Sequence, residues 1–247
     1  IIDLEDGCPA DQKVLAREEL INLLKENAFT KPVFIRVNDA MEAIGREDID
    51  AISPYQDQIE AIILPKTQSF DFLATLAPMI DFSNKLVPLI ETPRAIDTVT
   101  QIAAVKDVVG LFFGAADSSA SLGCKLAWEP LLYARQKVVL AAAMYNLFTI
   151  DAPFFYMDDK EGLKKEAEAV KNLGFTGKAA IHPDQIDFIN ESFAPTSEEI
   201  AEGKKVLEEY QKSGGGAVKI DGQMVDEPIA EAMRLKISLG EEEENED

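Results

Sequence analysis

The sequence predicts an α/β protein of the TIM (β/α)8 barrel class, and three observations lead to this prediction. Short apolar runs recur along the chain, they are typical of strands buried on both faces, and most of them precede a helical pattern. The spacing from one run to the next is about 25 to 35 residues, the length of one strand-and-helix unit. A chain of 247 residues has the usual length of a barrel of eight such units.

Seven apolar runs are predicted as strands: 1–4, 33–37, 61–65, 86–90, 109–113, 147–151 and 178–183. We expect an eighth strand upstream of Ile1, so the barrel apparently lacks its first strand in this chain. A doubly wound open sheet is the alternative architecture. It usually carries a Gly-rich dinucleotide turn after its first strand, and the residues that follow Leu4, EDGCPAD, do not resemble one.

Helical periodicity is clear in three segments. Residues 11–27 place Leu20, Leu23 and Leu24 on one face, and residues 129–145 and 159–174 show the same pattern. The last of these segments ends at Gly174, as a helix C-cap would. The longest apolar run, VVLAAAMY, is shorter than the roughly 18 residues of a membrane span and predicts a buried helix.

The pattern changes after residue 195. A capping box, Thr196 to Glu199, opens a helix that ends in glycines, Asp221-Gly222 predicts a hairpin turn, and a last helix follows. We therefore predict three parts. They are a TIM-barrel catalytic domain at 1–195, a C-terminal hairpin-plus-helix appendage at 196–240, and an acidic disordered tail at 241–247.

Composition narrows the classes of function. The formal net charge of −21 argues against partners such as nucleic acid or an anionic membrane surface. Two cysteines, Cys8 and Cys124, do not make a disulfide framework, and they indicate a reducing compartment. With no signal peptide in the sequence, we expect a cytoplasmic protein.

Charged and polar side chains follow the predicted strands closely. In a TIM barrel the carboxyl ends of all strands meet at one mouth, so these side chains are expected to lie together. They are Asp3, Glu5, Asp6, Arg36, Asn38, Lys66, Glu91, Asp117, Asp151 and His182. Such a density of acids predicts a hard divalent cation, and Mg²⁺ typically takes one or two carboxylates while substrate and water complete its shell.

Glu91 and Asp117 are the best candidate pair of ligands, because each follows a strongly apolar strand. A nearby Arg would bind a substrate carboxylate with its two-pronged fork. A plainer interpretation also applies to each acid, since an Asp or Glu just after a strand often only caps the next helix. His182 is the only histidine, so a His-based metal site or dyad is excluded.

Six stretches together resemble the citrate lyase β-subunit-like family of the HpcH/HpaI aldolase superfamily. They read DLEDGCPADQKVLAR, FIRVN, LIETPRAI, LFFGAAD, GFTGKAAIHPDQIDFINESFAP and DGQMVDEP, in that order along the chain. The IHPDQ and GQMVDEP stretches are the most specific. Two departures stand out: a strand segment of the type RS-x-L-x-x-PG is missing, and Ala95 replaces a common Gly.

The resemblance implies a TIM barrel that assembles as a homotrimer or hexamer and performs Mg²⁺-dependent carbon–carbon lyase chemistry. The substrate would be a coenzyme A or acyl-carrier thioester of the citryl, citramalyl or malyl type. It would be cleaved to a 2-oxo acid and an acyl thioester through a metal-stabilised enolate.

The resemblance also implies roles for individual residues. Glu91 and Asp117 would bind the metal, with Glu91 also at the substrate, and Arg36 would bind the 2-oxo acid carboxylate. Glu5 and Asp6 would hold metal-bound water and orient Arg36. Asp226, in GQMVDEP, would be the acid/base group, brought by the C-terminal segment, often that of a neighbouring subunit. The plainer alternative is that Asp226 only caps the final helix, with Pro228 close behind it.

Two other functions remain open from the sequence. One is a pyruvate-type class II aldolase that uses a free aldehyde and no coenzyme A. The other is a non-catalytic barrel subunit that has kept the fold and lost turnover. The IHPDQ and MVDEP segments favour the lyase over the aldolase.

Overall fold

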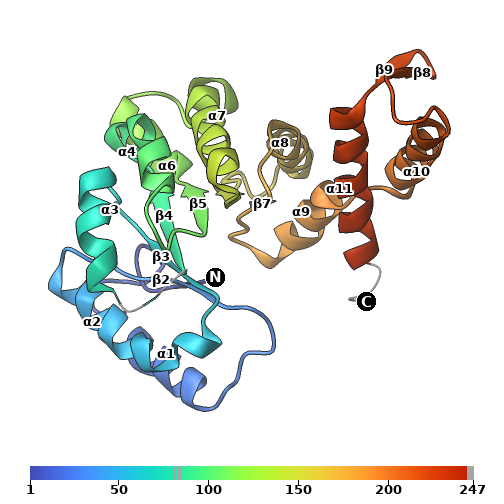
Figure 1. The fold of residues 1–247 in the computed structure, drawn as a ribbon. Coiled ribbons are helices and arrows are strands. Elements are labelled where there is room, and N and C mark those ends of the chain that lie inside the picture. Colours follow the sequence, from blue (N-terminus) through green and yellow to red (C-terminus); the bar gives the residue numbers. More distant parts are fainter. Residues whose placement is uncertain (81, 83–84, 244–247) are drawn as a thin grey trace. The chain divides into compact units, whose positions relative to one another are not determined.

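The computed structural model describes residues 1–80, 82 and 85–243, and the chain divides into two compact units. The first unit comprises residues 1–158 and 169–181, and the second comprises residues 159–168 and 182–247. Figure 1 shows the ribbon of both. The domain boundary at residues 195 and 196 stays a prediction.

A parallel sheet forms the centre of the first unit. Its seven strands are β1 (Ile2–Asp3), β2 (Phe34–Arg36), β3 (Ala61–Leu64), β4 (Leu86–Ile90), β5 (Gly110–Phe113), β6 (Phe148–Asp151) and β7 (Gly177–Lys178). They pair in parallel in the order in which they follow one another along the chain. Every residue of β3, β4 and β5 is buried, as expected for strands covered on both faces. The predicted α/β class with a parallel sheet is therefore confirmed.

The sheet curls strongly. Phe34 on β2 and Phe148 on β6 are separated by three strands in the sheet order, yet their ring centroids are 5.9 Å apart in an edge-to-face contact. Only a sheet that curves back on itself brings these rings together. Phe34, Phe148 and Ile150 pack against one inner core cluster that includes Ile63 and Phe112. The sheet as described has β1 and β7 as its two edges, so the structure contains a curled part of a barrel and not a closed one.

Helices lie along the outer side of this curled sheet (Figure 1). The α-helices of this side are α1 (Lys13–Lys25), α2 (Ala43–Ile52), α3 (Phe70–Leu76), α4 (Pro93–Asp97), α5 (Val99–Ala103), α6 (Ala115–Leu122) and α7 (Trp128–Tyr145). Two short 3-10 turns, η1 (Ser53–Gln58) and η2 (Ala77–Met79), join them to the strands. The repeated strand–helix order explains why the strands are parallel, since each helix carries the chain back to the end of the sheet at which the strands begin.

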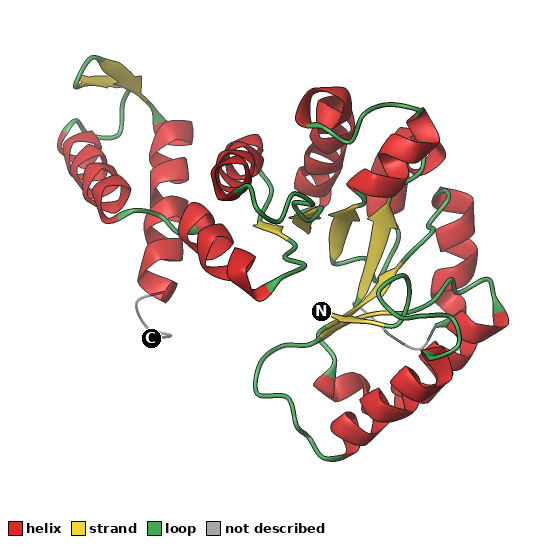
Figure 2. Cartoon of the chain, turned by 180° about the vertical axis from the view of Figure 1, so that it is seen from behind, coloured by secondary structure: helices red, strands yellow, loops and turns green. Residues whose placement is uncertain are grey.

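The second unit is helical, with a small hairpin (Figure 2). Its elements after η3 (Pro183–Gln185) are α9 (Ile186–Phe193), α10 (Ser197–Lys212), β8 (Val218–Ile220), β9 (Gln223–Val225) and α11 (Glu227–Glu243), and helix α8 (Lys160–Leu173) contributes its first half. Tyr210, Ile220, Val225 and Ala230 form a separate core here.

The predicted end signals of these elements are confirmed. Thr196 and Glu199 make both hydrogen bonds of a capping box at α10, and Gly174 follows α8 with a φ of 104°. Asp221 and Gly222 both adopt positive φ in the turn between β8 and β9, the conformation that a tight hairpin turn requires. The predicted acidic tail falls partly on α11, and residues 244–247 lie outside the described residues.

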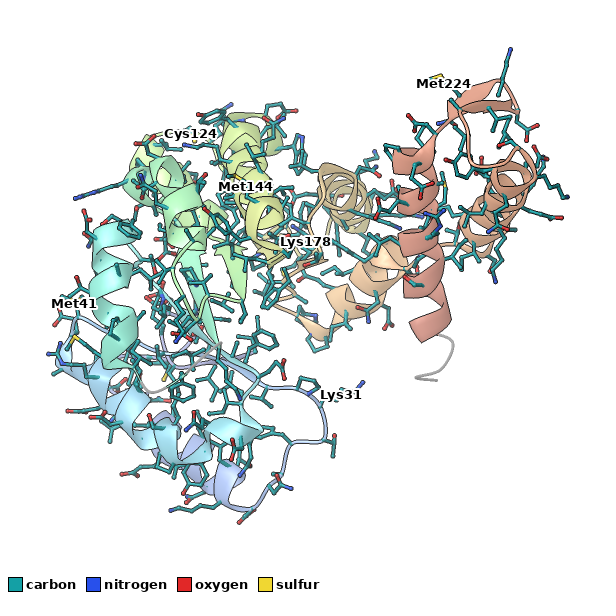
Figure 3. The ribbon with its side chains drawn as sticks, in the orientation of Figure 1. Lys31, Met41, Cys124, Met144, Lys178 and Met224 are labelled. Atoms are coloured by element: carbon teal, nitrogen blue, oxygen red, sulfur yellow. The ribbon has the colours of Figure 1, made fainter. Side chains whose placement is uncertain are left out.

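Two predictions about helix faces were wrong. Leu20 and Leu24 are buried in α1, but Leu23 is 41 % exposed, because it lies at the margin of the apolar face. Helix α7 is not buried all round: Leu140 and Met144, the latter labelled in Figure 3, are 63 % and 58 % exposed. Cys8 and Cys124 are both free thiols. Within the described parts of the chain, we find no helix with the length and apolar character needed to cross a bilayer.

Candidate active site

A cavity of about 310 Å³ opens in the first unit at the carboxyl ends of the strands. One half of its wall is charged, and the other half is apolar. The charged half is lined by Asp3, Asp6, Arg36, Glu91 and Asp117. They come from β1 and the loop after it, from β2, from the residue after β4, and from α6. Five of the side chains predicted from the sequence to share one mouth therefore line one cavity.

Arg36 ends β2 and is held by Asp3, the residue beside it in the sheet. The parallel register pairs Asp3 with Arg36, so both residues lie side by side at the carboxyl ends of β1 and β2. The Arg36 Nε donates to Asp3 Oδ1 at 2.7 Å, and Nη2 donates to Asp3 Oδ2. Arg36 Nη1 forms a longer ion pair, 3.4 Å from Glu5 Oε2. The edge of the guanidinium that carries Nη1 is thus the one suited to a further anion.

Asp3 is a carboxylate stabilised by one cation and two backbone N–H groups. Besides Arg36, it accepts hydrogen bonds from the backbone N–H groups of Glu5 at 2.9 Å and Gly7 at 2.8 Å. A side chain at residue 7 would start only 2.4 Å from Asp3 Oδ2, so this close contact requires Gly7. Burial raises the pKa of Asp3, but the Arg36 guanidinium and the two N–H groups outweigh that effect and hold the pKa below its usual value.

Glu91 follows β4 directly and has the opposite electrostatic environment. It is 5 % exposed, and its Oε1 accepts a 2.6 Å hydrogen bond from the backbone N–H of Lys66. Burial, with the negative charges of Asp117 and Glu5, raises its pKa to about 7, against the opposing effects of the Lys66 N–H and Arg36. A bound cation would stabilise the charged form of a buried carboxylate whose pKa is raised in this way.

Two backbone features shape the surroundings of Glu91. Lys66 adopts a φ of 53°, in the left-handed region that costs a non-glycine residue of the order of 1 kcal/mol, and its N–H donates to Glu91. Gly114, after β5, lies so close that an added Cβ would meet Glu91 Cβ at 2.6 Å and Oε2 at 3.0 Å. The end of β5 can therefore approach Glu91 only through a glycine.

Asp117 lies in the first turn of α6 and is exposed. An acid at this position is favoured by the helix dipole, so the residue stabilises α6 whether or not it binds a ligand. Among the described residues, no group of three or more His, Cys, Asp or Glu side chains is arranged to hold a metal. A metal at Glu91 and Asp117 would therefore take its remaining oxygens from substrate and water, the usual situation for Mg²⁺.

Glu5 and Asp6 lie beside Arg36 on the loop after β1. Glu5 is 4 % exposed and forms ion pairs with both Arg36 and Lys66, the latter 3.3 Å long. Asp6 is exposed at the cavity wall, and its charge acts on Arg36. Asp3 is nevertheless the principal partner of Arg36. This pairing could have been predicted from the sequence, because an Asp and an Arg stand at the ends of two successive predicted strands.

Three other residues predicted at the mouth do not line the cavity. The Asn38 side-chain amide donates a 2.7 Å hydrogen bond to Asp48 Oδ2, and the Lys66 side chain is about half exposed. Asp151 is buried in an ion-pair cluster with Arg135 and Lys178.

His182 and Asp226 belong to the second unit. The His182 Nδ1 accepts the backbone N–H of Asp184 at 3.2 Å and so caps η3. Asp226 precedes α11, and its Oδ1 accepts the N–H of Ile229 at 3.4 Å, as a weak helix cap. The geometry therefore supports the plainer interpretation of Asp226 as a helix cap, and its acid/base role stays a prediction.

A curled parallel sheet that brings an arginine, a buried glutamate and an exposed aspartate to one cavity is an arrangement suited to metal-assisted chemistry on a small carboxylic acid. Comparison with known proteins identifies the family of the chain. The family described as HpcH/HpaI aldolase/citrate lyase matches residues 1–183, and the chain belongs to this family. The predicted family resemblance is confirmed.

Three known proteins illustrate the likeness. The mitochondrial citramalyl-CoA lyase of Homo sapiens is 29 % identical, over 97 % of this chain and 77 % of its own. Citrate lyase subunit beta of Haemophilus influenzae is 30 % identical, over 95 % and 86 %. The crystal structure of the protein CitE from Mycobacterium tuberculosis, in complex with magnesium, acetoacetate and coenzyme A, superposes with a TM-score of 0.82. It is 30 % identical, over 97 % of this chain and 88 % of its own.

Proposed function

We propose that the protein is a Mg²⁺-dependent carbon–carbon lyase that cleaves a β-hydroxyacyl thioester of coenzyme A into a 2-oxo acid and an acyl thioester. The observation that carries the proposal is the cavity in which Glu91, Asp117 and Arg36 meet. The names of the relatives support it, since one is a citramalyl-CoA lyase, one is a citrate lyase subunit, and one was crystallised with magnesium and coenzyme A.

The donor set of the cavity fits a magnesium ion. Glu91 and Asp117 would hold it, because both offer carboxylate oxygens and the negative charge of one already disfavours ionisation of the other. When bound, Mg²⁺ supplies Lewis-acid stabilisation of the charge that develops on the keto oxygen of the 2-oxo acid. Glu5 and Asp6 would hold water next to this site.

Arg36 would orient the substrate by its carboxylate. Asp3 occupies the Nε side of the guanidinium and fixes its plane, which leaves the Nη1 side to the ligand. A fixed guanidinium binds a carboxylate with two parallel hydrogen bonds and loses little entropy on binding. Cleavage then breaks the bond between the hydroxyl-bearing carbon and the α-carbon of the thioester. The hydroxyl proton leaves, and the bonding electron pair stays on the α-carbon, which is protonated in turn.

We propose Asp226 as the group that exchanges this proton, acting on the cavity of a neighbouring subunit in a homotrimer or hexamer. The second unit has a core of its own, which suits an arm that serves another copy of the chain. Mixing inactive Asp226→Ala chains with inactive Glu91→Ala chains should restore part of the activity, because some mixed cavities regain both groups. No restored activity, despite proven subunit exchange, would refute action in trans.

We further propose that the curled sheet is part of a TIM (β/α)8 barrel, closed by a strand that pairs with β1 and β7. The consecutive parallel order and the Phe34–Phe148 contact support closure. The catalytic domain would then end near residue 195, and residues 196–240 would form the appendage. Hydrogen exchange on the full-length protein tests this, because slow exchange of the β1 and β7 amides is expected only if both edges are paired.

The lyase itself is tested with citryl-, citramalyl- and malyl-CoA, each with Mg²⁺ and with excess chelator, while the released 2-oxo acid is measured. We expect turnover of at least one thioester, dependent on Mg²⁺ and lost in Glu91→Ala and Asp117→Ala. Turnover of pyruvate with a free aldehyde, and of no thioester, would instead identify an aldolase. No turnover of any of these substrates, in the folded oligomer, would refute catalysis by the lyase mechanism.

A further inference from the structure

We infer that Lys13 is a positioning residue for the charged half of the cavity, although it is not among the described residues that line the cavity. It acts by fixing the backbone of residues 4–8, the loop that follows β1 and carries Glu5 and Asp6. The inference rests on the proposed metal site and extends it to residues outside the cavity. It also gives a role to Asn38, which was predicted at the mouth and does not line the cavity.

The Lys13 ammonium binds this loop from the side of α1. Lys13 is the first residue of α1 and is partly buried. Its Nζ donates to the carbonyl oxygens of Leu4 at 3.3 Å and Glu5 at 3.0 Å, and also to the side-chain oxygen of Asn38. An ammonium has three N–H donors, so these three acceptors can use all of them. The Lys13 side chain therefore ties the start of α1 to the backbone of the loop.

Asn38 holds the Lys13 ammonium in place. It is 3 % exposed, and its backbone N–H and side-chain amide donate to Asp48 Oδ2 at 2.9 and 2.7 Å. The other oxygen of Asp48 accepts a 2.7 Å hydrogen bond from Arg17 Nε. With its amide nitrogen bound to Asp48, Asn38 presents its oxygen to Lys13. A network that joins α1, α2 and the segment after β2 thus fixes the position of the ammonium.

Glu5 carries the effect of Lys13 into the cavity. Its backbone N–H donates to Asp3 Oδ1 at 2.9 Å, while its carbonyl accepts from Lys13, so its main chain is held on both sides. The carboxylate of Glu5 is thereby kept at 3.4 Å from Arg36 Nη1 and 3.3 Å from Lys66 Nζ. Without the Lys13 ammonium, the carbonyl side of this arrangement would be free to move.

Two kinds of role for Lys13 predict opposite effects on the metal. If only its positive charge mattered, removing that charge would leave the acids of the cavity less compensated and would strengthen Mg²⁺ binding. If Lys13 positions the loop, its removal releases Glu5 and Asp6, which are proposed to hold water beside the metal, and Mg²⁺ binding weakens. Groups that orient a metal site from outside its ligands typically change affinity by about 10–100-fold. The sign of the change therefore separates positioning from charge.

The experiment titrates full-length chains with MgCl₂ in a calorimeter, in the absence of substrate. We expect Lys13→Met to bind Mg²⁺ at least about tenfold more weakly than the unaltered chain. Lys13→Arg keeps the charge, but the N–H groups of a guanidinium lie in one plane and cannot reach three acceptors as those of an ammonium do. This variant should bind Mg²⁺ about threefold more weakly or less tightly still, the scale of one lost hydrogen bond, and it decides the question if Lys13→Met does not fold.

Lys85→Met is the matched control. The Lys85 Nζ also donates to two main-chain carbonyls, those of Gln56 at 2.6 Å and Ile59 at 2.5 Å. Lys85 precedes β4, at the end of the sheet opposite to the cavity, so its loss should lower stability to urea and leave Mg²⁺ affinity unchanged. In the metal-free chains, hydrogen exchange at the amides of residues 4–8 should become about tenfold faster in Lys13→Met and stay unchanged in the control.

The outcomes separate this inference from the proposed function. Unchanged or tighter Mg²⁺ binding by folded Lys13→Met, or exchange at residues 4–8 no faster than in Lys85→Met, overturns the inference and leaves the lyase intact. Lys13→Arg with the Mg²⁺ affinity of the unaltered chain also overturns it, because charge alone would then suffice. Cleavage of no thioester refutes the lyase, while both measurements still decide the role of Lys13. If the unaltered chain binds no Mg²⁺, the proposed metal site is refuted, and the exchange rates decide whether Lys13 fixes the loop.

Discussion

Replacing Asp151 by Asn should strongly destabilise the first unit. Asp151 is 0 % exposed and accepts ion pairs from Arg135 Nε and Lys178 Nζ, each at 2.8 Å. Asn keeps the size of the side chain but removes its charge. The two buried cations then lose the anion that they share, and one of them, Arg135, lies 5.1 Å from the Phe113 ring and 4.8 Å from the Trp128 ring.

The magnitude follows from the burial of the partners. Removing one member of a buried ion pair costs about 3–5 kcal/mol, because the desolvated partner loses its compensation. Total free energies of unfolding are typically about 5–15 kcal/mol, so this loss is a large fraction of the stability. Removing one cation as well should return part of it. Asp151→Asn with Lys178→Met should therefore be less destabilised than the two single changes add up to, with a coupling of about 1–3 kcal/mol.

The assay is urea unfolding followed by tryptophan fluorescence. Trp128 is the only tryptophan of the chain, and it lies in this cluster. Asp97→Asn is the matched control, because Asp97 is 84 % exposed in its 3.5 Å ion pair with Lys137 and should change stability by less than about 1 kcal/mol. A loss below about 1 kcal/mol for Asp151→Asn, similar to that of the control, would refute the reasoning.

Four further predictions concern the charged half of the cavity. Glu91→Gln and Asp117→Asn should each abolish specific Mg²⁺ binding, measured by calorimetry, while circular dichroism stays unchanged. Because burial raises the pKa of Glu91 to about 7, the Mg²⁺ affinity of the unaltered chain should fall as pH drops below about 7, where a proton occupies the carboxylate. Arg36→Lys should weaken 2-oxo acid binding by about tenfold or more, since Lys lacks the guanidinium group that can bind Asp3 and a substrate carboxylate at the same time. Asp3→Asn should weaken Mg²⁺ binding, although Asp3 is not a proposed ligand. Unchanged dissociation constants in any of these titrations would contradict the corresponding assignment.

The sequence predicted the parts of the fold that depend on local pattern. Strands buried on both faces read as continuous apolar runs, and β3, β4 and β5 fall within the runs expected for them. The acids of the cavity were also predictable, because parallel strands bring the residues that follow them to the same end of the sheet. The boundaries of the buried helix faces were harder to predict. Leu23 is three residues from Leu20 and was expected inside, but only its packing partners decide which side of the apolar stripe is covered.

Contacts that depend on register or on an unusual backbone could not be predicted. The fork between Asp3 and Arg36 requires that β1 and β2 pair with those two residues side by side, and one residue of slip would turn the side chains to opposite faces. The hydrogen bond from Lys66 to Glu91 depends on a left-handed backbone at Lys66, and Lys is not a residue type that signals this conformation. Asp151 looked like a mouth residue from its place after an apolar strand. Its neutralisation by Arg135 and Lys178 became visible only in three dimensions.

The opposite pKa shifts of Asp3 and Glu91 indicate how one arginine can serve a cavity with four acids. Asp3 receives the guanidinium and two backbone N–H groups, and its pKa falls below the usual value. Glu91 receives one backbone N–H and faces Asp117, and its pKa rises. If Asp3 did not hold Arg36, the guanidinium would be free to turn toward Glu91 and compensate it, and a metal ion would lose its advantage there. Asp3 thus keeps the arginine for the substrate and leaves the uncompensated carboxylates for the cation, which is why its loss should weaken a metal site that it does not touch.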